Sequence, residues 1–185
     1  MIVAVVALLA YAVDVVTKLL AVEHLTGRAD VQLVGEILQL RLTRNPGAAF
    51  STGTGYTSVL SIAAIVAVIV IVWLSRRVRN TVWAFALGLL LAGVSGNLTD
   101  RLLRAPGPLR GHVVDFLMLP NWPIFNVADI CINVAAGLIL LQAFRGVRLD
   151  GTRAEADDAD DADDAAAGPG AAAPESADAP GEVRP

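Results

Sequence analysis

Residues Ser58–Leu74 read SVLSIAAIVAVIVIVWL, and this stretch decides the class of protein to which the chain belongs. It carries no charged residue and reaches about 17 residues, the lower limit for a helix that spans a membrane. Three further segments are comparably apolar, and they cover residues 2–22, 82–103 and 123–144. The sequence therefore predicts an all-α membrane protein with four transmembrane helices.

The composition excludes a water-soluble globule. The chain has 185 residues, of which 55% are hydrophobic and only 17% are charged, whereas an ordinary soluble domain has about 25% charged residues. One cysteine and two histidines also exclude a disulfide framework and a Cys/His zinc site. We expect neither a metal ion nor a cofactor.

The net charge of −4 combines two opposed parts. Residues 150–185 hold eleven acidic residues and two arginines, whereas residues 1–149 hold twelve basic and seven acidic residues. The segment 150–185 has almost no large apolar residue, so it is predicted to be a disordered tail outside a membrane domain of residues 1–149. The small excess of positive charge in that domain does not indicate binding to nucleic acid.

The loops predict an orientation in the membrane. Arg76, Arg77 and Arg79 crowd the short loop between the second and third helices, and Arg145 and Arg148 follow the fourth. The positive-inside rule places these loops, and with them both termini, in the cytoplasm, although the outer loops also contain arginines. Tryptophan is typical of membrane interfaces, and three tryptophans occur at predicted helix ends, namely Trp73, Trp83 and Trp122.

Two outer segments carry more structure than a plain linker. Residues 31–42, VQLVGEILQLRL, alternate apolar and polar residues, which predicts short β-strands at the membrane surface. Residues 104–122 are broken by three prolines but contain an apolar run interrupted only by Asp115.

Three of the predicted helices carry polar residues, which are unfavourable in the hydrocarbon core of a membrane. Asp14 and Lys18 are four apart in the first, where they can form a pair on one face. Polar residues also share one face in the third and fourth helices: Asn97, Asp100 and Arg101, and then Asn126, Asp129 and Asn133. Ionisable residues within a membrane are costly and mark a functional interior.

The position of Asp115 suggests a carboxylate pair. It lies just before the fourth helix, which brings it to the membrane level of Asp129. Two facing carboxylates in a poorly solvated site cannot both ionise easily, so one keeps a proton, as in an aspartic protease. A proton- or ion-coupled transporter would show similar residues, although transporters usually have repeated halves and broken helices.

Five short motifs lie between residues 14 and 129. They are Asp14-Val-Val-Thr-Lys18, Asn45-Pro-Gly-Ala-Ala-Phe50, Gly96-Asn-Leu-Thr-Asp-Arg101, Val113-Val-Asp-Phe116 and Phe125-Asn-Val-Ala-Asp129. In sequence and in order they resemble the motifs of the signal peptidase II family, the membrane aspartic proteases of bacterial prolipoproteins.

The resemblance implies that Asp115 and Asp129 are the catalytic pair. It implies that Asn97 and Asn126 orient the carboxylates and the substrate, that Asp100 and Arg101 brace the site, and that Asn45 contacts the substrate. Asp14 and Lys18 would hold the first helix in place. Residues 31–42 would form an extracytoplasmic β-cradle and residues 104–122 a mobile outer flap.

The resemblance also implies a function. The enzyme would remove signal peptides from diacylglyceryl-modified prolipoproteins, cutting just before the lipidated cysteine. It would act as a monomer in the bacterial cytoplasmic membrane, among membrane lipids, with its active site near the outer face.

Overall fold

The computed structural model describes residues 1–47 and 56–153. Four helices account for most of it: α1 (Ile2–Leu25), α2 (Thr57–Ser75), α3 (Thr81–Leu103) and α4 (Val127–Phe144). Each is long and apolar enough to cross a membrane, so the prediction of four spans is confirmed. The predicted tail lies outside the described residues, apart from its first four.

α3 is the central helix and contacts each of the other three. Small residues allow this close packing, and those that are buried along α3 include Ala84, Gly88, Ala92, Gly93 and Gly96. Large apolar side chains instead point outward from α1 and α2, for example Leu8, Leu9, Ile62 and Ile69. This distribution suits a bundle whose solvent is lipid, because tight packing of small residues drives helix association there.

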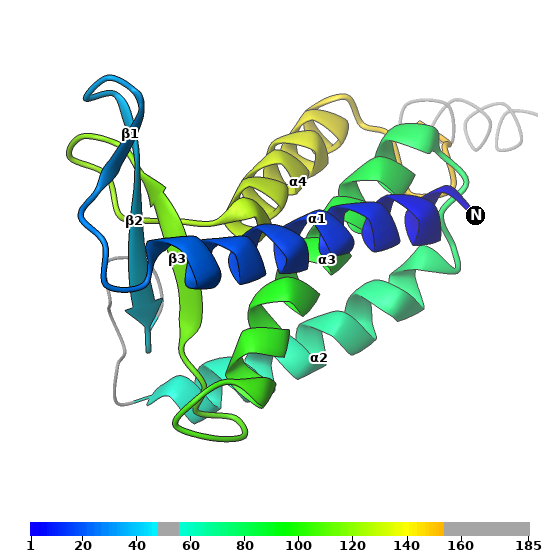
Figure 1. The fold of residues 1–185 in the computed structure, drawn as a ribbon. Helices are drawn as coiled ribbons and strands as arrows, with labels where there is room; N and C mark the ends of the chain where they lie inside the picture. Colours follow the sequence, from blue (N-terminus) through cyan, green and yellow to red (C-terminus); the bar gives the residue numbers. More distant parts are fainter. Residues whose placement is uncertain (48–55, 154–185) are drawn as a thin grey trace, which may run out of the picture. The chain divides into compact units, whose positions relative to one another are not determined.

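Three antiparallel strands form a small sheet in the order β1 (Val31–Val34), β2 (Leu38–Asn45) and β3 (Val113–Met118). Figure 1 shows them together at the end of the helices that lies opposite the N-terminus. β1 and β2 confirm the strands predicted over residues 31–42. Val114 and Phe116 of β3 pack with Ala21 and Leu25 of α1, which fixes the sheet to the helices.

β3 differs from the expectation for residues 104–122. The centre of the expected flap is a strand paired with β2, in register Thr43↔Asp115 and Asn45↔Val113. Its first four residues are buried. A run of apolar residues with one interruption is as compatible with a buried strand as with a covering segment, and only the pairing with β2 distinguishes them.

The start of the fourth helix also differs from the expectation. We expected it at residue 123 with Asn126 on a helical face, but α4 begins at Val127 and Asn126 caps it. Asn126 has an extended backbone, and its side chain and backbone exchange hydrogen bonds with Asp129. Hydropathy does not show where a helix starts, whereas this capping box does.

Candidate active site

Asp129 is held at the beginning of α4 by Asn126. The Asp129 backbone N–H donates to Asn126 Oδ1 at 3.0 Å, and the Asn126 backbone N–H donates to Asp129 Oδ2 at 3.1 Å. Asp129 is therefore in the first turn of α4, where the free N–H groups and the helix dipole stabilise a negative charge. The cap fixes both the position and the rotamer of this carboxylate.

Asp115 is presented by β3 and is only 2% exposed. Its two oxygens accept hydrogen bonds from two asparagine amides: Asn126 Nδ2 lies 2.6 Å from Oδ1, and Asn45 Nδ2 lies 3.0 Å from Oδ2. Burial raises the pKa of Asp115 to about 6. The hydrogen bond from Asn45 opposes this rise, and the charge of Asp129 adds to it.

Asn126 joins the two carboxylates, since one end of its side chain contacts Asp115 and the other caps Asp129. Asn97 completes the group, because its Nδ2 donates to Asp129 Oδ1 at 2.9 Å and its Oδ1 accepts from Asn126 Nδ2 at 3.1 Å. The structure thus brings together the four residues that the motifs placed at the reacting centre.

Lys18 lies behind this group and is 1% exposed. Its Nζ contacts three acceptors: Asp14 Oδ2 at 2.9 Å, Asn97 Oδ1 at 2.9 Å and Asp100 Oδ2 at 3.1 Å. An ammonium group only donates, so the oxygen of Asn97 faces Lys18 and its NH₂ group faces Asp129. A chain of oriented donors therefore runs from Lys18 through Asn97 to Asp129.

The remaining predicted residues connect the elements around the site. Asp14 Oδ1 accepts from the Ala128 backbone N–H at 2.8 Å, which links α1 to α4. Asp100 Oδ2 accepts from the Val114 backbone N–H at 3.1 Å, which links α3 to β3. Arg101 Nη2 donates to the Gly47 carbonyl at 2.7 Å and so holds the segment after β2.

A cavity of about 280 Å³ opens over the carboxylates. Six of the polar residues named from the sequence line it: Asn45, Asn97, Arg101, Asp115, Asp129 and Asn133. Asn126, Asp14, Lys18 and Asp100 do not line it and support the residues that do. The sequence interpretation missed the apolar part of the wall, which Trp122, Ile124 and Phe125 provide. Trp122 was interpreted as an interface anchor, and a pattern of aromatic residues gives no signal that separates the two roles.

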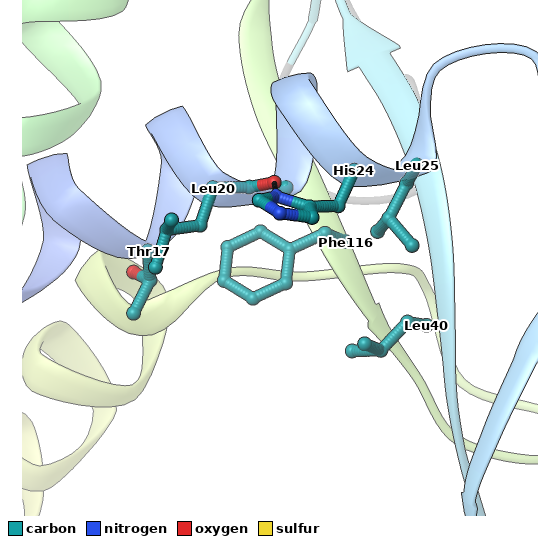
Figure 2. Close-up of a pocket in the computed structure, with 7 residues that line it drawn as sticks. Thr17, Leu20, His24, Leu25, Leu40 and Phe116 are labelled. Carbon is teal, nitrogen blue, oxygen red and sulfur yellow. Dashed lines mark hydrogen bonds between the residues drawn. The ribbon is translucent and has the colours of Figure 1, made fainter.

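A separate hollow of about 440 Å³ lies between α1 and the sheet. Figure 2 shows Thr17, Leu20 and His24 reaching into it from α1, with Phe116 and Leu40 on the side of the sheet. Its walls are almost entirely apolar and contain no carboxylate. Asp115 and Asp129 therefore line the polar cavity and not this hollow.

The described part of the chain, residues 1–47 and 56–153, contains no group of three His, Cys, Asp or Glu side chains that could hold a metal ion. What it offers is two carboxylates joined by one amide, in a confined cavity at the end of membrane-spanning helices. One buried carboxylate with a raised pKa beside a second that is capped is the arrangement with which aspartic proteases activate water. The fold and the site define a membrane protein with a paired-carboxylate hydrolytic centre.

Comparison with known proteins assigns the family. The chain belongs to the signal peptidase II family, since the family model described as Signal peptidase (SPase) II matches residues 6–145. Proteins named lipoprotein signal peptidase are similar to it. The protein of Leifsonia xyli subsp. xyli is 45% identical over 93% of this chain and 80% of its own length. That of Mycolicibacterium smegmatis is 50% identical over 80% of this chain and 63% of its own length.

Solved structures agree with this assignment. Two structures described as bacterial membrane enzymes match with TM-scores of 0.67 and 0.65, each at 28% identity. The first match covers 76% of this chain and 85% of the other. The chain is therefore an aspartic endopeptidase of the signal peptidase II type, and the transporter interpretation is not supported.

Proposed function

We propose that this enzyme removes signal peptides from diacylglyceryl-modified prolipoproteins and cuts just before the lipidated cysteine. The relatives named lipoprotein signal peptidase support the substrate class. The cavity supports it as well, because polar groups meet an apolar wall at the end of membrane-spanning helices, where a peptide with a membrane-embedded flank can be held. The observation that carries the proposal is the Asp115–Asn126–Asp129 arrangement.

In the proposed reaction, Asp115 and Asp129 share one proton and activate one water molecule. The ionised carboxylate takes a proton from water while the oxygen of that water attacks the scissile carbonyl carbon. The protonated carboxyl group donates its proton to the carbonyl oxygen. The resulting diol collapses when the leaving nitrogen takes the proton that came from water, the C–N bond breaks, and a diol hydroxyl returns a proton to the other carboxylate, which restores the pair. Neither a metal ion nor a covalent enzyme adduct takes part.

The surroundings of the two carboxylates support a division of these roles. Asp129 is in the first turn of α4, and both of its oxygens accept hydrogen bonds, from the Asn126 backbone N–H and from Asn97 Nδ2. Asp115 is buried in a strand, and its pKa is raised to about 6. We therefore assign Asp129 as the base and Asp115 as the acid in the first step.

The proposed orientation places both termini in the cytoplasm and the cavity near the outer face. The loop with Arg76, Arg77 and Arg79 and the segment with Arg145 and Arg148 meet at one end of the bundle, where the Arg79 backbone N–H donates to the Leu149 carbonyl at 3.0 Å. The carboxylates are at the other end, since Asp129 lies in the first turn of α4 and Asp100 in the last turn of α3. The site is contained within one chain, which supports action as a monomer.

Replacing either carboxylate by its amide tests the catalytic assignment. Asp115→Asn and Asp129→Asn keep the shape of the side chains but remove the acid and base, so we expect a loss of cleavage of at least about 10⁴-fold for each. The measurement is cleavage of a purified diacylglyceryl-modified prolipoprotein, with the unmodified precursor beside it.

Asp30→Asn is the matched control, since Asp30 pairs with Arg41 on the sheet and does not line the cavity. It should cleave at the rate of the unchanged enzyme. Cleavage by either site variant at that same rate would overturn the assignment of the pair, and equal cleavage of the unmodified precursor would overturn the substrate class.

A further inference from the structure

A third hollow, of about 690 Å³, lies at the end of the bundle opposite the carboxylates. It is lined by the start of α1, the end of α2, the α2–α3 loop and the start of α3. The apolar residues of its lining lie on the three helices, and this apolar wall includes Ile2, Val3, Val72, Ala84 and Leu91. Its mouth carries Arg76, Arg79, Asn80 and Thr81. The hollow is thus polar and cationic at the helix ends and apolar along the helices.

The arginines at this mouth are not neutralised by the described part of the chain. Arg76 and Arg79 are exposed and form no ion pair with any residue in 1–47 or 56–153. Among the residues that the structure describes, none of those that line the hollow is acidic. Their neighbour Arg77 is engaged elsewhere, because its guanidinium lies 4.2 Å from the centre of the Trp73 ring. Two guanidinium groups are therefore available to an anion at the mouth.

The loop that carries these arginines is held in place. The backbone N–H groups of Arg79 and Asn80 donate to the Leu149 carbonyl at 3.0 and 3.4 Å. Asn80 Oδ1 caps α3 by accepting from Val82 and Trp83, and it also accepts from Gln142 Nε2. These hydrogen bonds hold the mouth against α3, α4 and the segment after α4. The backbone from which its two arginine side chains extend is therefore held in place.

We propose that this hollow binds an anionic phospholipid. Arg76 and Arg79 contact the phosphate, which a planar guanidinium can bind through two parallel hydrogen bonds. One acyl chain lies along the apolar wall between α1, α2 and α3. The position at the ends of membrane-spanning helices is where phospholipid headgroups lie, and basic pockets between such helices bind acidic headgroups.

The shape and charge of the hollow favour a lipid over other anions. A small soluble anion would use the arginines but leave the apolar wall without a partner. The chain's own segment after Arg153 is rich in Asp and Glu but has almost no large apolar residue, so it too fits only the mouth. A phospholipid uses both parts, and this complementarity is the argument for it.

Native mass spectrometry and a binding titration on the purified full chain in neutral detergent test the proposal. The probes are phosphatidylglycerol and phosphatidylcholine with the same acyl chains, and inorganic phosphate. We expect phosphatidylglycerol to bind with a clear preference over the other two. Arg76→Gln with Arg79→Gln should weaken that binding about 25-fold, since each arginine near a headgroup contributes about fivefold.

Two further variants separate the hollow from a general surface charge. Ala4→Trp fills the hollow from an exposed position on α1 and keeps both arginines, so it should also abolish the preference. Arg145→Gln removes one charge from an arginine that does not line the hollow, and it should leave binding unchanged, whereas Arg76→Gln or Arg79→Gln alone should weaken binding about fivefold. Equal losses in Arg145→Gln and the double variant, or unchanged binding in Ala4→Trp, would overturn the proposal.

A chain that ends at Arg153 tests the acidic segment as a rival. If the full chain binds no phosphatidylglycerol and the shortened chain does, the acidic segment is the occupant and the proposal is wrong. Equal binding by the two chains supports a lipid site. Binding of phosphate alone with the affinity of the lipid would also overturn the proposal, because the apolar wall would then contribute nothing.

Discussion

At the scale of single residues, Lys18 is the side chain whose role the structure changes most. Its pairing with Asp14 was predicted from their spacing, but its contact with Asn97 was not. Because Lys18 only donates, it determines which end of the Asn97 amide faces Asp129. We infer that Lys18 positions the catalytic pair in addition to anchoring α1.

A comparison of two variants tests the Lys18 ammonium group, which contacts both Asn97 and Asp100. Asp14→Asn removes one partner of Lys18, whereas Asp14→Asn with Lys18→Met also removes the donor to Asn97 and spares Asp14 from being left as an unpaired buried charge. We expect kcat of the double variant to be about 100-fold below that of the single variant with little change in KM, because misplacing a reacting group costs about that much. Equal kcat values would show that Lys18 acts only by anchoring α1.

Asn45 controls the proton on Asp115. Its Nδ2 donates to the Asp115 carboxylate, and this hydrogen bond opposes the effect of burial, which keeps the pKa of Asp115 raised to about 6. Removing the donor therefore raises the pKa further, so Asp115 keeps its proton to a higher pH. With Asp115 as the acid, Asn45→Ala should move the alkaline limb of the kcat/KM profile to higher pH.

The control for this shift is on the same strand. Gln39→Ala removes an amide that contacts the Glu36 carbonyl and does not line the cavity, and its profile should coincide with that of the unchanged enzyme. A shift of the Asn45→Ala limb to lower pH, or no shift, would contradict the assignment of Asp115 as the acid.

At the scale of elements, the close approach of α3 to α1 and α4 beside the site depends on Gly93 and Gly96. A Cβ atom at Gly96 would collide with the carboxylate of Asp14, and one at Gly93 would lie 2.5 Å from the Ala128 carbonyl oxygen. Both neighbours are fixed, the first by Lys18 and the second by the first turn of α4. The glycines thus set the distance at which α3 can present Asn97 to α4.

Alanine at these positions should therefore destabilise the bundle. We expect Gly93→Ala and Gly96→Ala each to lower the free energy of unfolding by about 1–3 kcal/mol, as overpacking does. Gly137→Ala on α4 is the control, because nothing lies within 4 Å of its Cβ position, and it should be neutral or stabilising by up to about 1 kcal/mol. Thermal unfolding in detergent compares the three, and equal stabilities would contradict the packing argument.

At the scale of the whole molecule, the proposed orientation is tested by labelling single cysteines. Cys131 is the only cysteine and is buried, so Cys131→Ser provides the background. Glu36→Cys lies in the turn before β2, and Arg77→Cys lies in the loop between α2 and α3. A membrane-impermeant maleimide applied to spheroplasts should label the first directly and the second only after permeabilisation. The reverse result would invert the orientation.

Much of the bundle was predictable because hydropathy is a local property. Ser58–Leu74 identifies α2 without reference to the rest of the chain, and the alternation in residues 31–42 identifies β1 and β2. The two features that hydropathy misplaced, β3 and the start of α4, depend on partners. β3 is defined by its pairing with β2, and α4 starts where Asn126 and Asp129 cap each other.

The sequence by itself determined the four spans, the family and the set of polar residues in the site, because short motifs and apolar runs carry that information. Only the tertiary structure decided how those residues are joined. Asn45 reaches Asp115 across 70 positions, Lys18 reaches Asn97 across 79, and Asn97 reaches Asp129 across 32. The physical reason is that a hydrogen bond requires a particular distance and angle between donor and acceptor. For residues far apart in the sequence, the packing of α3 against α1, α4 and the sheet sets that geometry.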